Sequence, residues 1–171
     1  MPPASRSDSD TVSVRSARDD DADDLIALIG GCFAEYPGCI LDVDGEIPEL
    51  RGIASYAERR GGAFWSVERN SVVVACVGAM PAVEGGIELV KLYVRADQRG
   101  NGLGRQLIGQ VEAFAQGQGA RHIELWTDTR FTTAHRAYEA CGYVRQAATR
   151  ALNDKSNSVE YSYRKTLADA E

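Results

Sequence analysis

Hydrophobic and polar positions follow two different periods in the first third of the chain. "TVSVRSA", residues 11–17, alternates between polar and apolar, whereas "DADDLIALIGGCF", residues 21–33, is apolar at every third or fourth position after an acidic start. The first pattern predicts a strand and the second an amphipathic helix. A loop rich in Pro and Gly follows, and Pro48 then opens a second predicted helix that ends near Arg60.

The middle of the chain predicts three strands that follow one another as a meander. "AFWSVE" and "SVVVACVGAMP" indicate a hairpin that turns at residues 69–70, and "GIELVKLYV" is the third strand, after a turn with two glycines. The segment that follows the next group of glycines is apolar along one helical face and predicts a helix. That face carries Leu103, Leu107, Val111 and Phe114.

The last third of the chain predicts a strand, a helix and a closing pair of strands. "RHIELW" is the strand, "TTAHRAYEACG" is the helix with Gly142 as its stop, and "YVRQAAT" and "VEYSYRKT" are the closing pair. The predicted order is therefore β-α-α-β-β-β-α-β-α-β-β. This order favours the α/β class, with a mixed central sheet and helices on both of its faces.

Length and composition limit the number of domains. A chain of 171 residues with 44% hydrophobic content is large enough to bury one ordinary core, and it is too short for two comfortable domains. We therefore expect a single domain over residues 11–171. Residues 1–10 are rich in Ser, Asp and Pro, and we expect them to form a disordered tail.

Net charge and cysteine content limit the binding partners, the cellular compartment and the kinds of site that the sequence allows. The net charge of −6 argues against general affinity for nucleic acid or an anionic membrane surface, and it suits an acceptor that carries an amine. No apolar run approaches the ~20 residues that span a bilayer, and the start "MPPASRSDSD" lacks the layout of a secretory signal, so we expect a cytoplasmic protein. The four cysteines form no C-x-x-C pair, so neither a metal site nor a disulfide framework is expected.

Three glycines within five residues, Gly100, Gly102 and Gly104, separate a predicted strand from a predicted helix. The pattern is no Rossmann fingerprint, because Arg105 stands three positions beyond Gly102, and no Gly-Lys-Ser/Thr follows to make a Walker A loop. Two interpretations remain open: the glycines let a phosphate approach the free N–H groups of the helix, or they satisfy the geometry of a tight turn. Arg99 and Arg105 on either side favour the anion.

Two motifs resemble those of the GNAT acetyltransferases. "RGNGLG", residues 99–104, resembles the R/Q-x-x-G-x-G/A acetyl-CoA signature of that family and follows a strand that ends "KLYV". "AHRAYEACGY" resembles the later family helix with A-x-x-x-Y followed by G-F or G-Y. The resemblance implies a mostly antiparallel sheet with one splayed parallel pair, "IELVKLYV" and "HIELW". The chain departs from the family at Phe131, where many members place Asn, so a contact to the pantetheine arm is missing or replaced.

The same resemblance implies that acetyl-CoA is bound at the glycine turn. The amides of Val94 and of residues 100–105 would hold the pyrophosphate of CoA. The pantetheine arm would then run between the two splayed strands. The residues implied to contact the cofactor are Leu92, Tyr93, Val94, Arg99, Gly100, Asn101, Gly102, Leu103, Gly104 and Arg105.

Glu88 is the candidate base, because acetyl transfer requires removal of a proton from the acceptor ammonium. A period of two along "IELVKLYV" puts Glu88 on one face with Val90, Leu92 and Val94, where desolvation would raise the pKa of its carboxyl group. The resemblance agrees, since several family members place a glutamate at this distance before the glycines. A solvated charge at the strand end is the alternative.

Tyr138 is the candidate acid. Its helical face also carries Ala134 and Cys141, and an aromatic residue in that position is more often packed in a core than used in catalysis. The family resemblance favours the second role, because a tyrosine at this position commonly protonates the CoA thiolate.

Four further residues are candidates for contact with the acceptor. Asp128, Arg130 and His135 follow the strand "RHIELW", at an edge where open α/β sheets collect ligands. For Asp128 a cap on the following helix is favoured instead, and for His135 a position facing solvent is the commoner case. Glu46 lies in the acidic loop "LDVDGEIPE", which is either a lid that attracts an amine or a merely solvated loop. Trp126 belongs to the core or lines the cleft.

These residues together predict an acetyl-CoA-dependent N-acetyltransferase that acts on a primary amine of a small molecule or peptide. Transfer is expected to be direct, within a ternary complex, because no cysteine has a recognisable activating partner. The alternative is a non-catalytic sensor module that binds acyl-CoA and needs neither Glu88 nor Tyr138. A modifier of charged tRNA would need a basic face, which the net charge disfavours. The oligomeric state is open, with a homodimer as one option.

Overall fold

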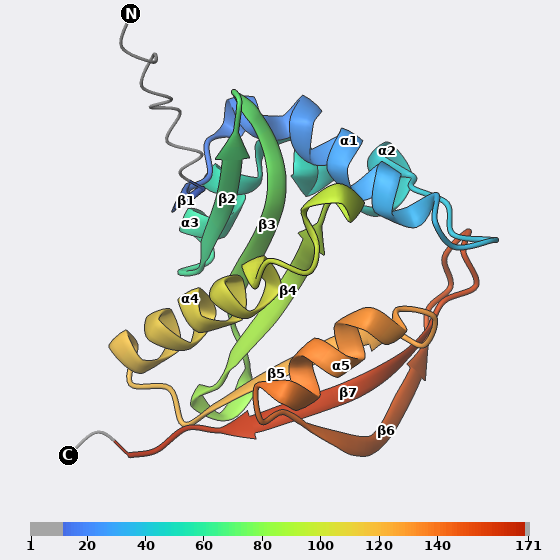
Figure 1. Cartoon of the computed structure of the whole chain (residues 1–171). Coiled ribbons are helices and arrows are strands. Elements are labelled where there is room, and N and C mark those ends of the chain that lie inside the picture. The colour runs from blue at the N-terminus through green and yellow to red at the C-terminus, as the bar shows by residue number, and fades with distance from the viewer. Residues whose placement is uncertain (1–11, 170–171) are drawn as a thin grey trace, which may run out of the picture.

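A computed structural model describes residues 12–169, and the expected tail at residues 1–10 lies outside that range. Its strands form one mixed sheet, in the order β1-β2-β3-β4-β5-β7-β6 (Figure 1). Neighbouring strands are antiparallel except β4 and β5, so the expected α/β class and mostly antiparallel sheet are confirmed. The strands are β1 Ser13–Ser16, β2 Ala63–Arg69, β3 Val72–Pro81, β4 Ile87–Val94, β5 His122–Asp128, β6 Val144–Ala151 and β7 Val159–Thr166. The helices are α1 Ala22–Phe33, α2 Val43–Glu46, α3 Ile53–Arg59, α4 Leu103–Gly117 and α5 Thr132–Ala140.

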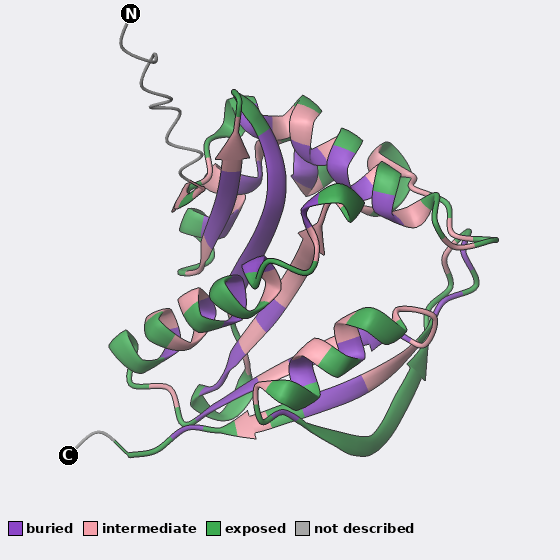
Figure 2. Ribbon diagram, in the orientation of Figure 1, coloured by how far each residue is buried: buried purple, intermediate pink, exposed green. Residues whose placement is uncertain are grey.

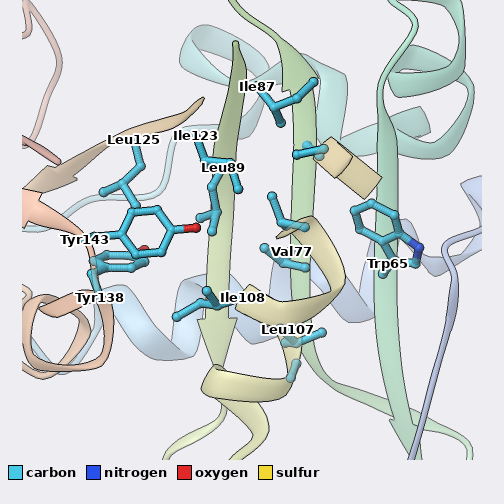
Figure 3. Packing of buried hydrophobic residues seen from close by; sticks show 14 of the residues in the cluster. Trp65, Val77, Ile87, Leu89, Leu107, Ile108, Ile123, Leu125, Tyr138 and Tyr143 are labelled. Atoms are coloured by element: carbon cyan, nitrogen blue, oxygen red, sulfur yellow. The ribbon is translucent and has the colours of Figure 1, made fainter. Parts of the chain in front are cut away.

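Helices cover both faces of the sheet, as expected. Helices α4 and α5 pack on one face, where Leu107 and Ile108 lie against Val77 and Leu89 in the larger apolar cluster (Figure 3). Helices α1 and α3 cover the other face through a smaller cluster that includes Leu25 and Ile53. The apolar face expected for α4 is confirmed, because the sheet buries its leucines.

A β-bulge interrupts β4 at Lys91. Gly78 pairs with Val90 and Cys76 with Tyr93, so β4 carries one residue more than β3 between these pairs. Lys91 takes a left-handed conformation, with φ of 51°. An extra residue inverts the alternation of side chains that follow it in the strand.

The bulge makes one expectation wrong. Ile87 and Leu89 face the α4–α5 cluster before the bulge, whereas Leu92 and Val94 face it afterwards. Glu88 therefore does not share a face with Leu92 and Val94. It lies on the opposite face of the sheet, together with Tyr93, which packs on the α1–α3 cluster.

The parallel strands β4 and β5 separate almost as soon as they meet. They pair only at Ile87 with Ile123 and at Glu88 with Glu124, and then diverge toward their C-terminal ends (Figure 1). This is the splayed pair that the family resemblance implies. Their divergence opens the sheet between Glu88 and the ends of both strands.

Three local expectations differ from the structure. The helix expected from Pro48 is a 3-10 helix over Pro48–Gly52, and the α-helix begins only at Ile53. The hairpin of β2 and β3 turns at Asn70 and Ser71, one residue later than expected, because Arg69 still pairs with Val72. Both turn residues have positive φ, 52° and 64°, as a tight hairpin requires. The expected loop before Pro48 contains the short helix α2, whose start is stabilised by a hydrogen bond from the Gly45 N–H to the Asp42 carboxylate at 3.1 Å.

Strand β6 forms one edge of the sheet and is exposed along its whole length (Figure 2). Its pairing with β7 shifts register between Arg145 and Thr149, so the strand bows outward at this point. Within residues 12–169, no helix has the length and apolar character needed to cross a membrane, and no group of three or more His, Cys, Asp or Glu residues could hold a metal ion.

Helix α4 offers a matched pair of glycines for a stability test. Gly119 follows the helix with φ of 68°, whereas Gly109 lies inside it, and neither would bring an added Cβ within 4 Å of another group. Gly119→Ala should destabilise the fold by about 1–2 kcal/mol, because alanine resists the left-handed conformation. Gly109→Ala should stabilise it by about 0.5–1 kcal/mol. Urea unfolding measures both, and shifts of the same sign would contradict this description of the helix end.

Candidate active site

Two cavities lie along the splayed strands and share a wall. The first, of about 250 Å³, extends from the glycine turn to α5, and the second, of about 370 Å³, lies over β4 and β5 beneath the segment that contains α2. Four residues line both cavities: Leu92, Tyr93, Phe131 and Ala134. A molecule that fills the first cavity therefore reaches the second at this wall.

The glycine turn forms one end of the first cavity. Gly100 and Gly102 both have φ of 82°, which favours glycine, and Gly102 immediately precedes α4. A Cβ placed on Gly100, Gly102 or Gly104 would meet nothing within 4 Å. The first N–H groups of α4 have no partner within the helix and point toward this open space. The turn thus has the geometry and the dipole to bind an anion.

Arg99 takes part in the turn as a structural residue. Its Nε donates to the Val94 carbonyl at 2.9 Å, and both terminal nitrogens donate to the Glu35 carboxylate at 2.7 Å. These bonds connect the glycine turn to the end of α1. Arg105, in the first turn of α4, also lines the cavity.

Phe131, the position that departs from the family pattern, belongs to an aromatic cluster in the shared wall. Its ring lies 5.0 Å from that of Tyr36 and 6.1 Å from that of Phe33, and Phe33 in turn contacts Tyr93 at 5.9 Å. An apolar wall thus stands where a polar side chain was expected from the family pattern. A ligand passing this point meets aromatic faces instead of an amide group.

Glu88 lies in the second cavity, half-buried, opposite Glu124 on β5. Burial raises the pKa of its carboxyl group, and the positive charge of Arg150 partly opposes the shift. No residue within the described chain donates a hydrogen bond to Glu88. Its carboxylate is therefore available to a ligand in the cavity. The desolvation inferred from the strand pattern is present, although the side chain lies on the other face of the sheet.

Tyr138 lines the second cavity from the opposite side of the sheet. Only 5% of the residue is exposed, and its ring packs 6.0 Å from those of both Tyr143 and Tyr163. Burial raises the pKa of its hydroxyl, which therefore keeps its proton. The hydroxyl makes no hydrogen bond with any residue in the range 12–169. Tyr138 is thus both a core residue and an unpaired donor at the cavity.

Asp128 and Arg130 form a tightly bonded pair at the end of β5. Arg130 donates to the Asp128 carboxylate through Nε at 2.9 Å, Nη2 at 2.8 Å and its backbone N–H at 2.8 Å. Burial opposes ionisation, but the bonds from Arg130 hold the pKa of Asp128 below its usual range. The expectation that Asp128 caps α5 is wrong. Helix α5 begins after Phe131 with no side-chain cap, because the Asp128 carboxylate accepts its hydrogen bonds from Arg130 instead. Asp128 lines the second cavity, whereas Arg130 lines neither cavity.

The structure places His135 in the interior, contrary to the expected solvent-facing position. Its ring packs against those of Tyr161 and Tyr163, at 5.5 and 5.9 Å, and its Nε2 is 2.9 Å from the Asp128 carbonyl oxygen. Burial lowers the pKa of its imidazole. His135 lines neither cavity and supports the end of β5.

Glu46 lies at the rim of the second cavity, in a clasp between two segments distant in sequence. Its carboxylate accepts the Lys155 backbone N–H at 2.7 Å, and the Lys155 ammonium lies 2.6 Å from the Asp42 carboxylate. The Ser156 hydroxyl bonds both backbone groups of Ile40, at 2.8 and 3.1 Å. The loop after α1 and the loop between β6 and β7 meet here (Figure 1). The acidic loop is thus part of a roof held by specific bonds.

Sequence reasoning missed Arg150 and Glu160, which line the second cavity from the β6–β7 hairpin. They form an ion pair at 2.7 Å, and the Arg150 guanidinium stands 4.3 Å from the Trp126 ring centroid. Trp126 lines the cavity, which is one of the two positions expected for it, the core or the cleft. Nothing in the sequence indicates that this hairpin lines the cavity, because its two strands show only an ordinary pattern of polar residues.

Comparisons with known proteins agree with this geometry. A family model described as the acetyltransferase (GNAT) family matches residues 22–143. N-acetyltransferase 8 of Homo sapiens is 33% identical over 94 residues, which make up 52% of this chain and 41% of that protein. This chain thus spans less than half of that relative.

Solved structures share the fold. An acetyltransferase of the GNAT family from Staphylococcus aureus Mu50 has a TM-score of 0.79 at 20% identity, covering 92% of this chain and all of that one. The yncA structure from Salmonella typhimurium, solved with its cofactor acetyl-CoA, has a TM-score of 0.71 at 15% identity and covers 94% of this chain and 96% of its own. At these identities the likeness concerns the fold.

The pair of Asp128 and Arg130 predicts a pH-dependent loss of stability. Asp128→Asn should lower the free energy of unfolding by about 2 kcal/mol at pH 7, because it removes a buried charge and leaves Arg130 without its main partner. The folded pKa of Asp128 lies below the unfolded value of about 3.9, so its contribution is present above that pH and lost as pH falls through the folded pKa.

Urea unfolding at pH 7 and below pH 4 measures this effect. The difference between parent and variant should narrow as the pH falls. Asp20→Asn serves as the control, because Asp20 is exposed and pairs with the exposed Arg18, and its effect should stay within about 0.5 kcal/mol. Equal losses for the two variants would contradict a structural role for Asp128.

Proposed function

Because the chain belongs to the acetyltransferase (GNAT) family, we propose that it is an N-acetyltransferase that transfers an acetyl group from acetyl-CoA to a primary amine of its acceptor. One observation carries the proposal. An anion-binding glycine turn and a cavity with an unpaired, half-buried carboxylate lie on two sides of one shared wall. Donor and acceptor can therefore meet at that wall while each keeps its own binding cavity.

The first cavity fits the pyrophosphate and pantetheine of acetyl-CoA. The open space over Gly100, Gly102 and Gly104 suits a phosphate, which would be held by the N–H groups at the start of α4 with Arg105 nearby. Leu92, Tyr93 and Val94 line the cavity along β4 and would contact the pantetheine arm. Arg99 would act indirectly by holding the turn in shape. Acetyl-CoA supplies the activated acetyl group, and every other role belongs to the chain.

Glu88 is the proposed base. Its raised pKa makes it a better proton acceptor than an exposed glutamate, and within residues 12–169 no group donates a hydrogen bond that would have to break first. Its charge would also attract the acceptor as an ammonium ion before deprotonation. Asp128, although close by, is held ionised by Arg130 and is a much weaker base.

Tyr138 is the proposed acid. Its buried hydroxyl is protonated at physiological pH and lines the cavity beside Ala134, a residue of the shared wall. A proton donor at that position would neutralise the thiolate that leaves the thioester.

The cysteines support direct transfer over an acetyl-cysteine intermediate. Cys32 lines the first cavity and Cys39 the second. Burial raises the pKa of both thiols, so neither is activated as a nucleophile. The acceptor amine would therefore attack the thioester itself.

Substitution at Gly104 tests the cofactor site. Gly104→Val should weaken acetyl-CoA binding by about tenfold or more, because the side chain fills the space where the pyrophosphate would lie. Arg99→Ala should weaken it less, since the Arg99 guanidinium already bonds Glu35. Isothermal titration calorimetry measures both affinities. Gly109→Ala, in the same helix away from the turn, is the control, and unchanged affinity in Gly104→Val would place the cofactor elsewhere.

Substitutions at Glu88 and Tyr138 test the chemistry. CoA release from acetyl-CoA is followed with a panel of primary amines, and each variant should lower kcat by on the order of 10²-fold or more. The loss in Glu88→Gln should shrink as pH rises, because an amine that is already deprotonated needs no base. Tyr138→Phe should leave acetyl-CoA affinity nearly unchanged, because only the leaving thiolate loses its partner.

The full pH–rate profiles distinguish the alternatives. Profiles of both variants that coincide with that of the parent would show that the proposed base and acid are wrong. If the protein binds acetyl-CoA but releases no CoA with any amine of the panel, it would instead be a sensor module that uses the cofactor cavity alone.

A further inference from the structure

Arg150 projects from β6 into the acceptor cavity. Its Nε donates to the Glu160 carboxylate at 2.7 Å, and its guanidinium stacks on Trp126 at 4.3 Å. Its side chain is 44% exposed, so the group is held in place yet open to a ligand. A guanidinium that is bonded on one edge and stacked on an indole has lost most of its freedom before any ligand arrives.

The other edge of this guanidinium is available. The hydrogen bonds that Arg150 makes within residues 12–169 all go through Nε, so Nη1 and Nη2 keep their donors. Lys91, the other cation in the cavity lining, already lies 3.3 Å from the Glu49 carboxylate. Arg130, nearby, uses its Nε and Nη2 on Asp128. Among the described cations that line this cavity, Arg150 is therefore the one whose Nη1 and Nη2 both remain free to donate, side by side in one plane.

Arg150 and Glu88 line the same part of the second cavity. Glu88 lies opposite Glu124 on β5, and Trp126, two residues further along β5, points to the same face and carries the Arg150 guanidinium. The cavity is otherwise rich in carboxylates, which favour an ammonium group. A single available guanidinium within this acidic surface therefore marks a place for a negative group on an otherwise cationic ligand.

We propose that the acceptor is an amino carboxylic acid whose carboxylate is bound by Nη1 and Nη2 of Arg150 while its amine lies toward Glu88. This inference rests on the proposed acetyltransferase function and narrows its acceptor class. A forked guanidinium matches a carboxylate through two parallel hydrogen bonds. Amines without a carboxylate, including amino acid amides and peptide N-termini, lack this contact and are poorer acceptors.

Matched pairs of ligands test the inference. The twenty amino acids and their carboxamides are titrated by calorimetry into the protein saturated with CoA, and CoA release from acetyl-CoA is measured with the same pairs. For at least one pair, the acid should bind and react about tenfold to hundredfold better than its amide. Arg150→Gln should remove this preference by weakening the acid alone, and Arg150→Lys, which keeps the charge without the fork, should restore it in part.

Arg145→Gln is the matched control. Arg145 lies on the same strand and stacks on Tyr161 at 3.3 Å, but it lines neither cavity, so this variant should keep the preference for the acid. Equal affinity for acids and amides in the parent, absence of binding by every amino acid, or equal losses for acid and amide in Arg150→Gln would overturn the role of Arg150. Turnover of carboxylate-free amines under those outcomes would leave the acetyltransferase function standing, whereas absence of turnover with every amine would contradict that function separately.

Discussion

β4 and β5 share two paired positions and then separate, and the site depends on that separation. An intact parallel pair would have filled the space between the strands with backbone hydrogen bonds and left no opening through the sheet. The bulge at Lys91 adds a second effect, because it turns Leu92 and Val94 toward the α4–α5 face while Glu88 and Tyr93 point to the other. One strand thus lines both cavities, and the wall between them is a single layer of side chains.

Electrostatics then divides the carboxylates of the second cavity into two kinds. Asp128 is bonded by Arg130, its pKa is lowered, and it holds the end of β5 together with His135. Glu88 lines the same cavity but accepts no hydrogen bond from residues 12–169, and burial raises the pKa of its carboxyl group. The same functional group therefore serves structure in one place and is free to accept a proton in the other. The clasp of Asp42 and Glu46 on Lys155 uses two further carboxylates to fix the roof.

The sequence predicted the order of the strands and of every helix except the short α2, and it predicted the glycine turn, because periodicity and glycine spacing are local properties. It also led to Glu88, but the reason given for its face was wrong, since a bulge depends on pairing with β3 and cannot be read from one strand. His135 was misjudged because its partners Tyr161 and Tyr163 lie on β7 and reach it only in the folded chain. Asp128 was misjudged because its carboxylate bonds Arg130, two residues away, instead of the start of α5. Arg150 was not predicted as a site residue, because its position depends on contacts with Glu160 on β7 and Trp126 on β5, which a single strand does not reveal.

A crystal structure with a bisubstrate analogue, CoA joined through an acetyl group to an amine, would show whether donor and acceptor meet at the wall between the two cavities. We expect the pyrophosphate to lie against the N–H groups that follow Gly102 and the acetyl linker to cross the wall between Leu92 and Ala134. The amine nitrogen should then lie within hydrogen-bond reach of Glu88, directly or through one water. An analogue whose CoA half avoids the glycine turn, or whose amine half leaves the cavity of Glu88 empty, would contradict it.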